Sequence, residues 1–184
     1  MQLQDTGLRF SRVTVVLHWL VAVLLFAIIA LEFAIVPGSH ASGSAALSET
    51  QNLLGLILCL VSIYRFWARV SSYHPLPVGT PNPVEIIISR SVAVALALAM
   101  VLLPVAAWLY KASAGEVMGL PGGFHIPAVI APNLAVQQVV GVLFKIGGIA
   151  FLAGLVLHIF GAMKNHFVLK NDTLKRMLGK HVEL

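Results

Sequence analysis

Four long apolar runs divide the 184-residue chain and limit the folds open to it. A helix needs about 20 apolar residues to cross a ~30 Å hydrocarbon layer, and each run is of that order. Backbone groups in lipid must be hydrogen-bonded internally, and no segment alternates as a β-barrel strand does, so the runs are predicted to be helices. The sequence thus predicts an all-α membrane protein, a four-transmembrane-helix bundle in one membrane domain, residues 1–184. The spans are expected at about residues 12–35, 51–69, 86–110 and 139–163.

Composition excludes two broad classes of protein. Only 10% of the residues are charged and 59% are hydrophobic, whereas a soluble domain has about 25% charged residues. A soluble globular enzyme is therefore excluded. The single cysteine, Cys59, excludes an internal disulfide and any cysteine-built zinc or iron–sulfur site. The first run could instead be a signal peptide, but it is longer than a typical h-region and no small-residue cleavage site follows promptly, so a retained span is expected.

The positive residues predict an orientation. Lys111 is the only lysine or arginine in the two loops that join span one to span two and span three to span four. Lys145 lies inside the fourth run. The positive-inside rule then places both termini and the middle link in the cytoplasm. The net charge of +5 reports this topology and does not indicate a nucleic-acid partner. The residues on the predicted cytoplasmic side are Arg9, Arg12, Arg65, Arg69, Arg90, Lys164, Lys170, Lys175, Arg176 and Lys180.

The three links differ in composition. Residues 37–50 are expected to form a short polar external loop, and the proline-rich residues 71–83 an extended internal connection. Residues 111–138 form the longest link. Because this link contains two apolar stretches, residues 117–120 and 126–130, we expect it to lie on the external membrane surface.

Two histidines, His18 and His158, fall well inside predicted spans. Each lies six residues, about 9 Å along a helix, from the cytoplasmic end of its run, marked by Arg12 and Lys164 respectively. On antiparallel helices the two imidazoles reach one depth, as bis-histidine haem ligation requires. Hydrogen bonding of each histidine to a neighbouring helix stays open. A metal ion without haem is disfavoured, since neither carboxylate nor thiolate lies near.

Arginines at the same ends of the spans fit the haem hypothesis. Haem propionates are anionic, and guanidinium groups pair well with carboxylates. The candidates are Arg12, Arg65, Arg69 and Arg90, although simple interfacial anchoring is equally open for any one of them. His166, about 12 Å along a helix from His158, is expected at the interface. The remaining histidines are expected to be solvated: His40, His74, His125 and His181.

Five motifs spread over nearly the whole chain carry a family resemblance. They are Arg12 with L-H-W-L at 17–20, Y-R-F-W-A-R at 64–69, L-P-V at 103–105, H-I-F-G-A-M-K-N-H-F at 158–167 and N-D-T-L-K-R-M at 171–177. With these motifs the chain resembles the bacterial cytochrome b561 family of four-span haem proteins, related to the cytochrome b subunits of nickel hydrogenases. The resemblance implies haem b between His18 and His158, electron exchange with membrane quinone, and residence in the bacterial inner membrane.

The chain departs from this family at the second haem. Typical members hold another haem near the external surface, and the corresponding ligand positions here are Gln51 and Phe144. Neither residue can ligate iron in the usual way, so one haem is expected. A second haem held by His40 and His125 stays open. Lys145, next to Phe144, is expected either to snorkel to the external surface or to contact an anionic ligand or a quinone oxygen.

The resemblance and the histidine pair together predict a membrane b-type cytochrome that transfers electrons between quinone and a redox partner protein. It could act as a simple carrier or as a quinone-linked oxidoreductase. Two alternatives stay open, a superoxide oxidase-like activity coupled to quinone reduction and a non-redox family member acting as an assembly or transport subunit. A homodimer also stays open, because Gly147 and Gly148 suit helix contacts within or between chains.

Overall fold

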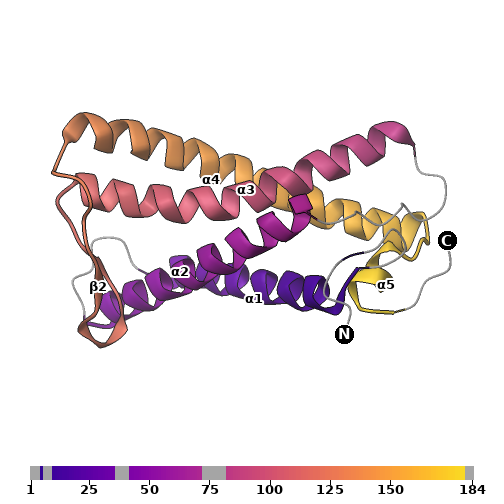
Figure 1. The fold of residues 1–184 in the computed structure, drawn as a ribbon, viewed down its shortest axis with the longest axis horizontal. Helices are drawn as coiled ribbons and strands as arrows, with labels where there is room; N and C mark the ends of the chain where they lie inside the picture. Colours follow the sequence, from indigo (N-terminus) through magenta and orange to yellow (C-terminus); the bar gives the residue numbers. More distant parts are fainter. Residues whose placement is uncertain (1–4, 6–9, 36–41, 72–81, 181–184) are drawn as a thin grey trace. The chain divides into compact units, whose positions relative to one another are not determined.

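The computed structural model describes residues 5, 10–35, 42–71 and 82–180. It contains four long helices, each long and apolar enough to cross a membrane, which confirms the predicted four-helix membrane fold. The four are α1 (Arg12–Ala34), α2 (Ser42–Ser71), α3 (Pro83–Ser113) and α4 (Leu134–Met163), drawn in Figure 1. The predicted loop histidines His40, His74 and His181 lie outside the described residues.

The helices extend beyond the apolar runs that predicted them. α2 begins at Ser42, so the prediction of a loop over residues 37–50 was wrong for residues 42–50. Hydropathy marks the part of a helix that lies in lipid, whereas its first turn is fixed by groups that satisfy its free N–H groups. Polar residues do this before three of the long helices: Thr14 N donates to Ser11 Oγ (3.1 Å), Val84 N to Asn82 Oδ1 (2.9 Å) and Val136 N to Asn133 Oδ1 (3.1 Å).

The link between α3 and α4 contains a small hairpin that the sequence analysis did not predict. β1 (Met118–Gly119) pairs antiparallel with β2 (His125–Ile126) across η1 (Pro121–Gly123). Gly122 and Gly123 both adopt positive φ angles, of 80° and 79°, which glycine adopts without a steric penalty. The signal was present as P-G-G between two apolar stretches.

Two side chains fasten this link to the neighbouring helices. Asn52 Nδ2 of α2 donates to the Gly119 carbonyl at 2.9 Å. Trp108 Nε1 of α3 donates to the Pro127 carbonyl at 3.1 Å. The link is therefore held at β1 and directly after β2, and it is not a free loop.

The chain forms two compact units, each of which draws on all four long helices. Unit 1 comprises residues 1–20, 63–99 and 149–184, and unit 2 comprises residues 21–62 and 100–148.

Glycines of α4 allow close approach to α3 within unit 2. A Cβ at Gly147 would lie 3.2 Å from Leu103 Cδ2, whereas a Cβ at Gly148 would meet no atom of the described residues within 4 Å. Small residues at such positions let membrane helices pack closely. Gly147 thus faces a helix of its own chain.

This difference between adjacent glycines predicts a difference in stability. We expect Gly147→Leu to lower the free energy of unfolding by about 1–3 kcal/mol relative to Gly148→Leu, because only the first forces a side chain into a packed contact. Both changes alter helix propensity equally, so the pair isolates the contact. Thermal unfolding in detergent measures it, and equal stabilities of the two variants would contradict the packing described.

Candidate functional site

His18 of α1 and His158 of α4 meet within unit 1. Their ring centroids are 6.1 Å apart, and the ring planes are tilted by 57°. Both side chains are half-buried. The structure therefore brings together the two histidines that the sequence places inside spans.

The separation of the two rings suits one metal atom between them. Two bonds of about 2 Å from ring nitrogens to a metal put the nitrogens about 4 Å apart and the ring centroids roughly 6 Å apart. Among the described residues there is no group of three or more His, Cys, Asp or Glu side chains that could hold a metal ion. Two axial nitrogens without further protein ligands fit haem, whose macrocycle supplies the remaining ligands.

Arg65 of α2 contacts His18 of this pair directly. Its Nη2 lies 3.3 Å from His18 Nδ1. A guanidinium only donates hydrogen bonds, so Nδ1 accepts here and the neutral ring carries its proton on Nε2. Ligation through Nε2 requires the proton on Nδ1 instead, so the Arg65 contact must then give way. Arg65 would then be available to an anion beside the pair.

Arg65, Arg69 and Arg90 form what we call the arginine cluster. Arg69 lies within electrostatic range of Arg65, Arg90 and His158, and Asp5 is the acidic group that acts on it. The Nε atom of Arg69 is buried and has no hydrogen-bond partner among the described residues. A buried unsatisfied N–H costs about 1–3 kcal/mol, and neighbouring guanidiniums repel one another. Carboxylate groups such as haem propionates would relieve both costs.

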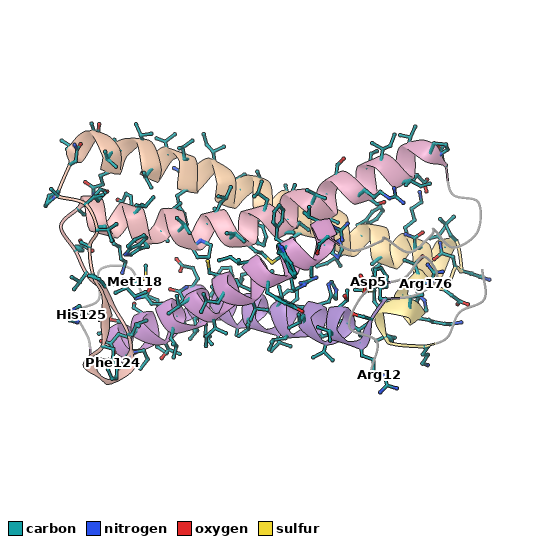
Figure 2. The ribbon with its side chains drawn as sticks, viewed as in Figure 1. Asp5, Arg12, Met118, Phe124, His125 and Arg176 are labelled. Carbon is teal, nitrogen blue, oxygen red and sulfur yellow. The ribbon has the colours of Figure 1, made fainter. Side chains whose placement is uncertain are left out.

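Arg12 differs from the arginine cluster in its surroundings. Its side chain is exposed at the start of α1 and projects outward in Figure 2. Arg90 is also exposed, but it remains within electrostatic range of Arg69. The structure thus places Arg65 and Arg69 within electrostatic range of the histidine pair. Arg90 reaches this site only through Arg69, and the Arg12 side chain is exposed.

Unit 2 contains Gln51 and Phe144, the two residues that the family resemblance matched to the ligand positions of a second haem. Gln51 Nε2 of α2 donates to Glu32 Oε2 at 2.8 Å and to the Ile28 carbonyl at 3.3 Å, both on α1. Phe144 of α4 is 41% exposed, and its neighbour Lys145 is exposed as well. The amide of Gln51 therefore binds another helix, and the Phe144 side chain is partly exposed.

His125 lies on β2, where its side chain is exposed. Figure 2 shows it on the hairpin beside Phe124. His40, its suggested partner for a second haem, lies outside the described residues.

Two residues beside the site were not predicted from the sequence, Trp19 and Asp5. Trp19, next to His18, donates its indole N–H to the Met177 carbonyl at 2.7 Å. Asp5 accepts two hydrogen bonds from the start of α1, each of 2.7 Å, and acts electrostatically on Arg69. The tryptophan and the tail that it contacts both stood in the motifs quoted above. For Asp5, a lone acid in a polar N-terminal segment, the sequence offers no signal.

Comparison with known proteins gives the family. The family model described as prokaryotic cytochrome b561 matches residues 9–180. The chain belongs to this family. A relative, "Cytochrome b561 homolog 2" of Escherichia coli (strain K12), is 29% identical over 181 residues, which cover 98% of this chain and 96% of the relative.

Membership of the cytochrome b561 family confirms the resemblance drawn from the motifs. With four membrane-spanning helices, it makes the chain a multi-pass membrane protein and supports a role as a b-type cytochrome in electron transfer. The family also implies binding of haem b.

Proposed function

We propose that this b561-family chain is an electron carrier of the bacterial inner membrane that holds one haem b between His18 and His158. The observation that carries the proposal is the 6.1 Å separation of the two imidazoles within unit 1. The arginine cluster supports it, because Arg69 offers a buried N–H that no group in the described part of the chain accepts.

Each residue of the site has a distinct role in this proposal. His18 and His158 would hold the haem iron, and Arg65 and Arg69 would pair with the propionates, with Arg90 adding positive charge. When bound, haem b supplies a one-electron couple. The guanidinium charges favour the reduced state, since reduction removes one positive charge from a site that already contains several.

A single haem is supported by the residues of unit 2. Gln51 is hydrogen-bonded to Glu32 and the Ile28 carbonyl, and Phe144 is 41% exposed. Neither position supplies an imidazole. With one haem near the arginine cluster, on the predicted cytoplasmic side, electron exchange with quinone and with a redox partner protein takes place in that leaflet.

Exchange with quinone can be measured directly. We expect a short-chain quinol to reduce the purified, oxidised protein, with the appearance of the sharp α-band of a b-type haem, and the matching quinone to reoxidise it. The His158→Ala variant is the control for reduction that does not pass through this site. Haem-loaded protein that is inert to quinol would contradict the quinone part of the proposal.

The same preparation separates the two alternatives. Reduction of the haem by superoxide, followed by electron transfer to quinone, would favour the superoxide oxidase-like activity. Folded protein that binds no haem would favour a non-redox role in assembly or transport.

A further inference from the structure

The segment after α4 folds back toward α1 through a specific turn. α4 runs into η2 (Lys164–Val168), a π-helical turn, and Lys164 Nζ is paired with Glu85 Oε1 of α3 at 2.7 Å. Lys170 then adopts a positive φ of 50°, which reverses the chain. Asn171 fastens the turn, since its Nδ2 donates to Asn165 Oδ1 at 2.8 Å. The course of the segment after α4 is therefore set by defined contacts.

The short helix α5 (Thr173–Met177) follows this turn. Thr173 N donates to Asn171 Oδ1 at 3.2 Å, and Arg176 is only 7% exposed, so α5 is packed against the rest of unit 1. The last carbonyls of a helix have no partner within it. Those of Leu174, Lys175 and Arg176 accept the N–H groups of the residues that close the helix. The Met177 carbonyl accepts a side chain instead.

That side chain is Trp19 of α1. Its Nε1 donates to the Met177 carbonyl at 2.7 Å, a contact that joins residues 158 positions apart. The indole ring also meets the ring of His18, edge to face, with centroids 5.5 Å apart and planes at 80°. This is the arrangement that aromatic rings prefer at such a distance. The ring that borders the axial histidine is thus held by the C-terminal segment.

From these contacts we infer that Trp19 is a positioning residue: its hydrogen bond to the Met177 carbonyl fixes the orientation of the His18 ring, so that α5 sets the axial ligand geometry. The inference rests on the proposed function, because it assigns His18 to the iron. Neighbours that hold a ligating histidine commonly fix its ring orientation and tune the metal that it binds. Here the neighbour of His18 is the aromatic ring of Trp19, which is itself hydrogen-bonded to the last residue of α5.

Two variants remove the hydrogen bond between Trp19 and Met177, one by changing the donor and the other by removing the acceptor. Trp19→Phe removes the N–H but keeps an aromatic ring beside His18, and truncation after Asp172 removes the accepting carbonyl with α5. We expect both to retain haem and to shift the low-spin g-values of the oxidised protein in the same direction. In the double variant the shift should be no larger than the larger single one, because residues joined by one contact act non-additively.

A matched control and a milder variant complete the test. Trp108→Phe loses the same type of bond, from an indole to the Pro127 carbonyl in unit 2, and should leave the g-values unchanged. If the truncated chain fails to fold, Asn171→Ala loosens the turn before α5 and should give a smaller shift in the same direction. Wild-type g-values in haem-loaded Trp19→Phe, or additive shifts in the double variant, would overturn the inference. Wild-type protein without low-spin haem would instead overturn the proposed function.

Discussion

Replacement of either His18 or His158 by alanine is expected to abolish the low-spin b-type spectrum. The two imidazoles face one another at 6.1 Å, and the described residues offer no third histidine, cysteine or carboxylate grouped with them as a substitute. Each single variant should therefore lose the sharp reduced α-band completely. The measurement is the dithionite-reduced minus oxidised spectrum of the purified variants.

His166→Ala is the matched control for this loss. His166 lies in η2 of the same unit, and its ring contacts that of Phe167, with centroids 4.8 Å apart. We expect this variant to keep the wild-type spectrum. A low-spin spectrum that survives in His18→Ala or His158→Ala would show that the iron is bound elsewhere.

The second large effect concerns the arginine cluster. Arg69→Gln should weaken haem retention by ~10- to 100-fold, since charge-assisted hydrogen bonds contribute about 1.5–3 kcal/mol and 1.4 kcal/mol is tenfold in affinity. Arg12→Gln should change it little, because Arg12 is exposed at the start of α1. The haem remaining after challenge with an excess of a haem-scavenging apoprotein measures the difference.

This comparison separates propionate binding from membrane anchoring. If the arginines act only as interfacial anchors, Arg12→Gln and Arg69→Gln should behave alike. Equal retention of haem by the two variants would therefore contradict the role assigned to Arg69.

The spans could be predicted from the sequence because long apolar runs have one physical solution in lipid. The helix ends could not be read from the same signal. α2 starts at Ser42, well before its apolar run, because polar residues outside the lipid can continue a helix. The capping residues Ser11, Asn82 and Asn133 were visible and would have placed three starts correctly.

The site could be predicted only in part. Counting residues from the charged ends of the runs gave the depths of His18 and His158, but not their 6.1 Å separation, which depends on helix rotation. A helix that is apolar all round gives little sign of which face packs inward. For the same reason hydropathy could not distinguish the exposed Arg12 from Arg69 with its buried Nε.

The contact between Trp19 and Met177 was harder to predict from the sequence than the histidine pair. It joins opposite ends of the chain and depends on a π-helical turn followed by a residue with positive φ. Neither of these features has a sequence signal comparable to a capping residue or an apolar run.

The most direct test of the account is the ratio of haem b to protein in the purified wild-type chain. Haem is measured as its pyridine haemochrome, and protein by quantitative amino-acid analysis of the same sample. Binding between His18 and His158 alone predicts one haem b per chain. A ratio of two would contradict the assignment of Gln51 and Phe144 as non-ligands, and folded protein without haem would contradict the account altogether.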